Sequence, residues 1–354
     1  MVLKALPQLI NQLNPLTQEK FRRIYRLREE EGRLLIPPTM QEWVKEHLGP
    51  LEEVEQQKII HIENRITGRA IIFNPLRARR PDQMQNNDAV LDELIQRTEG
   101  GPFCHAEEQT PQDVFGRVRG SYCLTAANVS KIDKWHSILI FKHHHPLRWS
   151  AEEITDCLAT ANRWFQLVHE EDSKAVYPFL LWNCLWRAGA SIIHGHMQLL
   201  ISQQPYSQKK ILQQQISHYQ RRYQSSYLED IYEIHQALDL TLPTNDNSIK
   251  AFVNILPLKE KEITIFSPTF NPTLWNYFGQ LMTSYRDKLG VQSFNVGITL
   301  PPLNNQGKWQ LPVLIEITDR GRLESNHSDV GGMEKFAQEV IAADPFMVRE
   351  ALIN

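Results

Sequence analysis

Cysteines and long apolar runs are scarce in this sequence of 354 residues, and each scarcity excludes a class of protein. The chain has 4 cysteines and no C-x-x-C pair, so it lacks the disulfide framework of a small secreted protein. No run approaches the roughly 18 consecutive apolar residues that a membrane helix needs, and the first residues do not resemble a signal peptide. We therefore expect reduced thiols and a cytoplasmic location.

An excess of charge of either sign is also missing. The 38 Lys and Arg residues against 41 Asp and Glu give a net charge of −3. Coating nucleic acid or an anionic membrane requires a basic excess, so neither is expected as a partner. The 16 glycines and 20 prolines are too few for a low-complexity chain, and 42% hydrophobic residues are typical of a folded protein. At this length, two domains or two fused halves are expected.

Residues 1–55 are predicted to form a helical lead-in. From Thr17 to about Leu35, apolar residues recur at helical spacing among Arg and Glu, and Thr17 is the expected N-cap. Two prolines then end this helix, and a shorter helix around Met40–His47 ends at a Gly-Pro dipeptide.

The rest of the chain divides into two parts with the same order of predicted elements. Residues 56–204 contain strands on either side of a long helix, which begins at a capping box of Ser150 and Glu153. A glutamine-rich stretch marks a boundary, and residues 205–354 repeat strands, helix and strands. We expect an α+β fold of two fused half-domains, each with a mainly antiparallel sheet covered by helices. The predicted strands of the first part are Ile59–Ile62, Arg69–Phe73, Ser121–Thr125, Ser137–Phe141, Phe179–Trp182 and Ser191–Ser202.

The last of these strands contains the most informative residues of the chain. Because side chains alternate along a strand, His194, His196 and Gln198 share one face. Small residues from Gly189 to Ser191 precede them, so a phosphate can approach the backbone and meet a hydroxyl donor. A neutral imidazole can attack a phosphoryl group and hold it as a phosphoramidate while neighbouring donors stabilise the charge.

An H-x-H pair on a strand has two other interpretations. It also suits a metal-ligand pair or a structural pair, because imidazole is a common metal ligand and a good buried hydrogen-bonding group. The neighbouring Asn183, Ser191 and Gln198 favour the catalytic interpretation.

The pattern N…A-G-A-S-x-x-H-x-H-x-Q resembles the active-site strand of the galactose-1-phosphate uridylyltransferase branch of the histidine-triad (HIT-like) superfamily. That branch includes ADP-glucose phosphorylases and diadenosine tetraphosphate phosphorylases. The resemblance implies that His196 is the nucleophile that becomes nucleotidylated, and that Gln198 and Ser191 hold the transferred phosphate. It also implies that Asn183 and Gly189 lie at the nucleotide and phosphate. His194 is expected to position this loop or to bind zinc.

Three further segments resemble the same family. Asn74–Pro81 is similar to its R-x-x-R-P element, which implies that Arg77 and Arg80 bind nucleotide phosphates. On the residues alone, these arginines form either a rigid bidentate clamp or a solvated basic turn. Asn128 falls in a segment similar to the base and ribose side. Glu334 falls in one similar to a late loop that faces the other half of the substrate across a subunit interface, where an exposed glutamate is the alternative.

One departure from the family affects its structural zinc site. The family holds zinc with C-x-x-C, a downstream histidine and the first histidine of H-x-H, but here the first cysteine is replaced by glycine. Cys104, His145 and His194 are then the expected ligands of one zinc ion. Structural zinc usually takes four ligands, so a polar histidine-rich loop is the alternative. In the second half, Pro312 and Leu314 stand where relatives carry another histidine pair, and neither residue can ligate a metal.

We therefore expect an enzyme, a nucleotidyltransferase or phosphorylase that transfers a nucleoside monophosphate from a nucleotide sugar to a phosphate acceptor through a nucleotidyl-histidine. The alternatives are a diadenosine tetraphosphate phosphorylase and a non-catalytic nucleotide-binding protein. The expected partners are a nucleotide sugar or dinucleoside polyphosphate, a phosphate acceptor and a second copy of the chain. No organic cofactor is expected.

Overall fold

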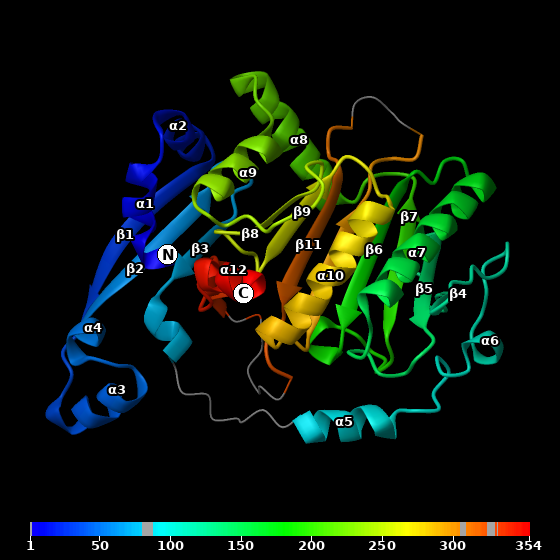
Figure 1. The fold of residues 1–354 in the computed structure, drawn as a ribbon, viewed down its shortest axis with the longest axis horizontal. Coiled ribbons are helices and arrows are strands. Elements are labelled where there is room, and N and C mark those ends of the chain that lie inside the picture. Colours follow the sequence, from blue (N-terminus) through cyan, green and yellow to red (C-terminus); the bar gives the residue numbers. More distant parts are fainter. Residues whose placement is uncertain (1, 80–87, 305–308, 324–329, 331) are drawn as a thin grey trace.

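The computed structural model describes residues 2–79, 88–304, 309–323, 330 and 332–354, which form two antiparallel-rich sheets with helices (Figure 1). The larger sheet has eight strands in the order β4-β5-β7-β6-β10-β11-β9-β8, and the smaller has the order β1-β2-β3-β12. The larger sheet contains β4 (Cys123–Ala127), β5 (Trp135–Phe141), β6 (Tyr177–Cys184), β7 (His196–Ser202), β8 (Lys250–Val253), β9 (Ile263–Ser267), β10 (Phe294–Thr299) and β11 (Val313–Asp319). The smaller contains β1 (Tyr25–Arg33), β2 (Gln56–Asn64), β3 (Ala70–Phe73) and β12 (Glu339–Ile341).

Helices surround both sheets, and no helix in the described part of the chain is long and apolar enough to cross a membrane. The α-helices are α1 (Leu6–Gln12), α2 (Pro15–Ile24), α3 (Gln41–His47), α4 (Leu51–Glu55), α5 (Asp88–Arg97), α6 (Ala106–Gln109), α7 (Ala151–Glu171), α8 (Ser207–Tyr223), α9 (Tyr227–Ala237), α10 (Pro272–Leu289), α11 (Gly332–Phe336) and α12 (Pro345–Ile353). Short 3-10 turns are η1 (Leu3–Ala5), η2 (Pro38–Met40), η3 (Pro75–Arg79) and η4 (Trp186–Ala188).

The two predicted halves join in one continuous sheet. Each half contributes four strands with the same connections, because β5 pairs with β4 and β7 as β9 pairs with β8 and β11. The halves meet where β6 pairs antiparallel with β10, with Trp182 opposite Val296. The α+β, antiparallel-rich architecture expected from the sequence is thus confirmed. The expected boundary after residue 204 falls between β7 and α8, and the division into domains there stays a prediction.

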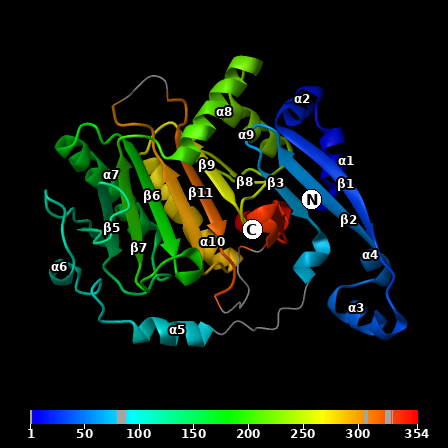
Figure 2. The same ribbon diagram turned by 180° about the vertical axis from the view of Figure 1, so that it is seen from behind.

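Two long helices cover one face of the large sheet. The predicted capping box at the start of α7 is present, since the Ser150 hydroxyl accepts from the Glu153 N–H and the Glu153 carboxylate accepts from the Ser150 N–H. α7 packs beside α10, and both lie in front of the sheet in Figure 1 and behind it in Figure 2. Their apolar faces bury Trp164 and Phe278 in the main core with Trp182 of β6. α7 and α10 therefore leave the opposite face of the large sheet uncovered, and other elements pack there.

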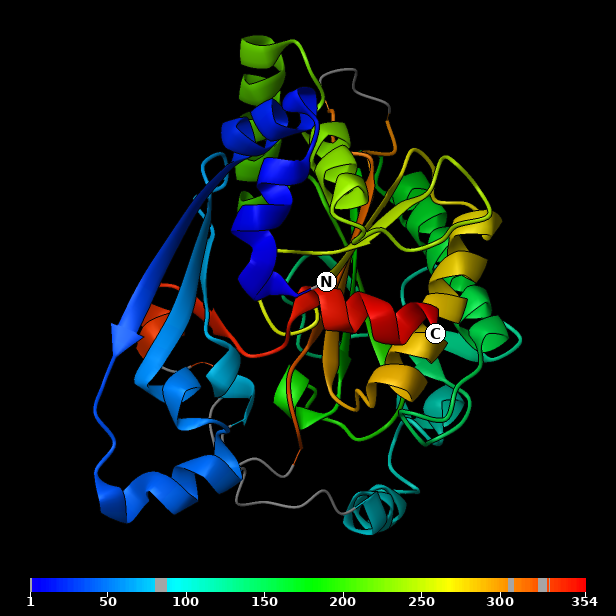
Figure 3. The same cartoon turned by 60° about the vertical axis from the view of Figure 1, so that its left-hand side comes forward.

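The small sheet forms a separate layer beside the second half of the large sheet. Figure 3 shows its strands β1, β2 and β3, in blue, apart from the central sheet, with the N-terminal helices and the red α12 beside them. Leu3 and Leu6 pack with Ile60 of β2 and Phe346 of α12 in a second core. The same core contains Leu314 of β11, so α8, α9 and the small sheet cover the outer face of the second half.

The helical lead-in expected for residues 1–55 is wrong for one segment. The expected helix from Thr17 to Leu35 is α2, which begins earlier, with Asn14 as its N-cap, and ends at Ile24. The chain then continues as β1, which pairs along its whole length with β2. Its Arg, Leu and Glu residues suit a helix locally, but pairing with a distant strand decides the conformation.

The contact between α7 and α10 depends on a glycine. A Cβ at Gly279 would lie 2.5 Å from the carbonyl oxygen of Ala151, which cannot move without shifting α7. We expect Gly279→Ala to lower the free energy of unfolding by about 1–3 kcal/mol, because an overpacked contact is strained. Urea unfolding measures this, with the neighbouring exposed substitution Gln280→Ala as control. Equal midpoints for the two variants would contradict the packing argument.

Candidate active site

His196 is the first residue of β7, and its ring is oriented by the backbone. Its Nδ1 lies 2.7 Å from the carbonyl oxygen of His194, and the ring is 8% exposed. A carbonyl oxygen only accepts, so Nδ1 carries the proton and Nε2 keeps a lone pair. Burial lowers the pKa of His196, which favours this neutral form. The ring of Phe103 stands edge-on to it, with centroids 5.4 Å apart.

The residue between the two histidines has to be glycine. A Cβ at Gly195 would lie 2.4 Å from Cδ2 of Phe141, a buried side chain of β5. Its backbone accepts from the Phe141 N–H at 2.9 Å and donates to the His144 carbonyl at 3.2 Å. The β5–β7 pairing therefore extends past the start of β7, and it holds the turn that carries His194.

The predicted strand Ser191–Ser202 begins only at His196, so its first five residues form an irregular loop. This loop starts at Leu185, a buried residue with a φ of 65°, which is an unusual conformation for a side chain of its size. Gly189 adopts the left-handed conformation with a φ of 89°, and Ser191 is exposed. The loop therefore presents small side chains and backbone to solvent just before the histidines.

Asn183 of β6 supports this loop indirectly, through Asn295. Its side-chain oxygen accepts from the Asn295 amide nitrogen of β10 at 2.7 Å. The same nitrogen donates to the Ala188 carbonyl at 2.8 Å. A strand of the second half thus supports the loop of the first half.

Gln198 contacts a histidine to which the sequence analysis gave no role. Its Oε1 lies 3.2 Å from Nε2 of His136, a buried residue of β5. The Ile132 N–H donates to His136 Nδ1 at 3.2 Å, so Nε2 carries the proton and donates to Gln198. The amino group of Gln198 is thereby directed away from His136. Asn128 Nδ2 also lies 3.1 Å from His136 Nε2, but both nitrogens carry protons, so this contact is not a hydrogen bond.

The position of His136 in the sequence was a usable signal. It follows Asn128 by eight residues and lies in a mostly apolar segment, where a buried polar side chain needs a partner. Burial lowers its pKa, so it stays neutral and can orient an amide at ordinary pH.

Cys104, His144 and His194 converge in a cluster next to the nucleophile. Cys104 Sγ lies 3.3 Å from His144 Nδ1 and 3.6 Å from His194 Nδ1, and the two nitrogens are 3.2 Å apart. The predicted ligand His145 was wrong, because its Nε2 instead lies 3.2 Å from Asp92 on α5. Three consecutive histidines follow β5, and the backbone turn presents the middle one to the cluster.

The hydrogen bonds of the cluster fit a metal ion. His194 Nε2 donates to the Phe141 carbonyl at 2.9 Å and His144 Nε2 to the Ile95 carbonyl at 2.8 Å, so both Nδ1 atoms are unprotonated. Two facing lone pairs repel unless a cation lies between them and the thiolate. Tetrahedral zinc with bonds of about 2.0–2.3 Å places its ligands about 3.3–3.6 Å apart, close to the distances here. Burial lowers the pKa of His194 to about 4, which favours its ligating form.

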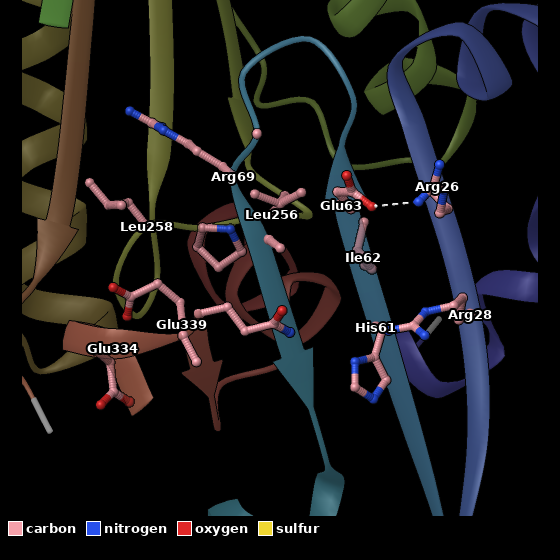
Figure 4. A pocket seen from close by; sticks show the side chains of 15 residues that line it. Arg26, Arg28, His61, Ile62, Glu63, Arg69, Leu256, Leu258, Glu334 and Glu339 are labelled. Carbon is pink, nitrogen blue, oxygen red and sulfur yellow. Dashed lines mark hydrogen bonds and ion pairs between the residues drawn. The ribbon is translucent and has the colours of Figure 1, made fainter. Parts of the chain in front are cut away.

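The remaining predicted residues lie elsewhere. Arg77 is in η3, which follows β3 of the small sheet, and β3 and β7 lie apart in Figure 1. Arg80 lies outside the described residues. Glu334 is in α11 and lines a cavity of about 410 Å³ at the small sheet, with Arg28 and Glu339 (Figure 4). One chain therefore does not bring Arg77 or Glu334 together with His196.

Comparison with known proteins gives similarity at the level of structure. No family model and no curated protein matches the chain. An ADP-glucose phosphorylase from Arabidopsis thaliana, solved with bound ADP-glucose, matches with a TM-score of 0.60 and 15% identity, covering 82% of this chain and 97% of that chain. A GalT-like protein from the same plant gives 0.61 and 15%, with the same coverage. A uridylyltransferase gives 0.57 and 14%, covering 82% of this chain and 96% of that one.

These similarities confirm, at the level of the fold, the resemblance to the galactose-1-phosphate uridylyltransferase branch. The match covers most of this chain and nearly all of each neighbour. At this identity it shows the HIT-like fold alone, so the chemistry of this chain has to be argued from its own side chains.

The cluster predicts that, of the three consecutive histidines 143–145, metal binding depends on His144 alone. We expect the purified protein to hold about one zinc ion per chain, and Cys104→Ser and His144→Ala to lose it, because three ligands cannot spare one. His145→Ala is the matched control and should keep its zinc. Plasma mass spectrometry after gel filtration measures the content. Wild-type protein without metal, or equal loss in His144→Ala and His145→Ala, would refute the assignment.

Proposed function

We propose that this protein is a nucleotidyltransferase or phosphorylase that moves a nucleoside monophosphate from a nucleotide sugar to a phosphate acceptor. The observation that carries the proposal is the hydrogen bond from His196 Nδ1–H to the His194 carbonyl, which leaves Nε2 as a nucleophile. Two further groups come from residues of the same motif, the amino group of Gln198 and the hydroxyl of Ser191. They are the proposed donors to the transferred phosphate.

The proposed reaction has two half-reactions at one nitrogen. His196 Nε2 attacks the α-phosphorus of the donor, the Nε2–P bond forms, and the bond to the leaving sugar phosphate breaks with its electron pair on that oxygen. The modified ring is a cation, because Nδ1 keeps its proton, and the His194 carbonyl stabilises it. An oxygen of the acceptor phosphate then attacks the same phosphorus, and His196 is released as a neutral ring.

The cluster of Cys104, His144 and His194 has a structural part in this proposal. A zinc ion held there would fix the segment that carries His194, and with it the carbonyl that orients His196. His194 is thus a positioning residue. Asn183 and Gly189 shape the loop that faces the phosphates, and Asn128 lies on the side of the nucleoside.

Residues near the small sheet are proposed to act in the active site of a second copy of the chain. Arg77 and Arg80 are proposed to neutralise the distal phosphates, and Glu334 to bind a sugar or ribose hydroxyl. Because Arg77 and Glu334 lie apart from β7 within one chain, we propose a homodimer in which they serve the partner's site. All four cysteines are free, which suits the proposed cytoplasmic location.

The identity of the acceptor distinguishes the proposed transfer from a nucleotide sugar from the alternative, a diadenosine tetraphosphate phosphorylase. Both reactions use the same nucleophile. A diadenosine tetraphosphate phosphorylase takes inorganic phosphate as acceptor, whereas a uridylyltransferase takes a sugar phosphate. A donor screen with UDP-glucose, UDP-galactose, ADP-glucose and diadenosine tetraphosphate, each labelled at the α-phosphorus, distinguishes them. A non-catalytic nucleotide-binding protein would take no covalent label from any donor.

The nucleophile assignment predicts the outcome of one substitution. We expect a donor to leave acid-labile, base-stable label on the wild type and on His218→Gly, an exposed control. His196→Gly should lower both label and turnover by on the order of 10³-fold or more, since the attacking group is removed. Label or turnover near the wild-type level in His196→Gly would rule out this nucleophile.

The contact between His136 and Gln198 predicts a coupled effect. His136→Phe keeps a ring but cannot donate to Gln198, so we expect kcat to fall about tenfold with a smaller change in KM. His136→Gln, whose amide can donate, should recover most of the loss. Adding His136→Phe to Gln198→Ala should cost little more than Gln198→Ala alone. Independent, multiplying effects would show that His136 does not act through Gln198.

A further inference from the structure

The second half repeats the side-chain arrangement of the first-half site with different residues, although the two asparagine contacts differ in kind, since His136 Nε2 carries a proton and Glu262 Oε1 accepts one. In the first half, Asn128 Nδ2 lies 3.1 Å from the ring of His136, eight residues later. In the second half, Asn254 Nδ2 donates to Glu262 Oε1 at 2.9 Å, again eight residues later. Both residues are buried: His136 is the second residue of β5, and Glu262 directly precedes β9.

The backbone contacts repeat as well. The Ile132 N–H donates to His136, and the Leu258 N–H, four residues before the acceptor in the same way, donates to Glu262. The side-chain oxygens of Asn128 and Asn254 each accept from the N–H two residues later. Glu262 therefore occupies the position of His136 in the duplicated half.

The strand register identifies the counterparts of the other site residues. Gln198 lies opposite Ile138, and Glu316 lies opposite Thr264, which are equivalent positions in the two halves. Two residues earlier on β11, Leu314 stands where His196 stands on β7. The second-half site keeps polar side chains but has no nucleophile at the position of His196, which suits binding without transfer.

A cavity of about 290 Å³ lies over these residues, between α8, α9 and the outer face of the large sheet. Apolar and aromatic side chains form much of its wall, among them Tyr25, Ile211 and Phe252. Its size is near the lower limit of about 300 Å³ for small-molecule sites, which fits one nucleoside or one sugar. A nucleotide sugar is too large for it.

The charged groups of the cavity cancel. Glu262 is 2% exposed, and its Oε1 lies 4.0 Å from Arg69. Glu316 lies 3.6 Å from Arg69 and forms an ion pair with Lys209. An anionic ligand meets two carboxyl groups and a cationic ligand meets two basic groups, so an uncharged ligand fits best.

Carboxyl groups recognise vicinal hydroxyls, as an acidic residue binds ribose in many nucleotide sites. The carboxylate oxygens of Glu262 accept from Asn254 Nδ2 and from the Leu258 N–H, and each keeps a further lone pair that can accept from a ligand hydroxyl. The aromatic and apolar wall suits a flat or apolar ring face.

We propose that this second-half cavity binds an uncharged molecule with vicinal hydroxyls, a nucleoside or a free sugar. The proposal does not rest on the transfer activity of His196. In this proposal the second half keeps the strand arrangement of the first-half site. Carboxyl groups that bind a diol stand where the first half has groups proposed to bind phosphate.

Calorimetric titration of the full chain with adenosine, uridine, glucose and galactose tests the proposal. Ile211 lines the cavity and is 52% exposed, so Ile211→Trp should close the cavity while the protein stays folded. Leu16→Trp, at an exposed position on α2, is the matched control. Asn128→Leu alters the first-half site instead.

We expect at least one probe to bind at a site that Ile211→Trp removes and that Leu16→Trp and Asn128→Leu retain. If the nucleosides bind, 2′,3′-dideoxyadenosine should bind at least about tenfold more weakly than adenosine, because it lacks the diol. If Ile211→Trp fails to fold, Gln208→Trp on the same rim replaces it. No binding of any probe, or binding removed by Asn128→Leu and unchanged by Ile211→Trp, would overturn the proposal. Either result leaves the labelling experiment on His196 unaffected.

Discussion

The hydrogen bond between His196 Nδ1 and the His194 carbonyl is the contact on which the candidate active site depends. It fixes which nitrogen of His196 holds the proton and leaves the other free to attack. Both groups belong to one turn, so the bond forms only if the backbone from His194 to His196 keeps its shape. Gly195 meets this requirement, because any larger residue would collide with Phe141.

The side chain of His194 ties this turn to the rest of the molecule. Its Nε2 bonds to the Phe141 carbonyl and its Nδ1 faces Cys104 and His144, so strand pairing and the metal-type cluster act on the same residue. From the other side, Asn295 of the second half donates directly to the Ala188 carbonyl of the loop that precedes the histidines, and Asn183 holds Asn295 in place. The fused sheet is therefore part of the site: loss of the β6–β10 pairing would release the loop.

Local sequence patterns were sufficient for much of this description and insufficient for the rest. The strands, the helix capped by Ser150 and the H-x-H motif are set by periodicity and neighbouring residues. β1 is set by a partner strand some thirty residues later, which no local pattern contains. The choice of His144 over His145 depends on a backbone turn, and the correspondence of Glu262 with His136 rests on hydrogen bonds between residues that differ in type. These features depend on contacts that only the three-dimensional structure shows.

The protonation state of one ring tests the central claim most directly. Nitrogen NMR spectroscopy of histidine-labelled protein, with His196→Gly to assign the signals, reports which nitrogen carries the proton. The account predicts a neutral ring at neutral pH, protonated on Nδ1, with the chemical shift of a lone-pair nitrogen at Nε2. A ring protonated on Nε2 would contradict it, because that nitrogen could then not attack phosphorus.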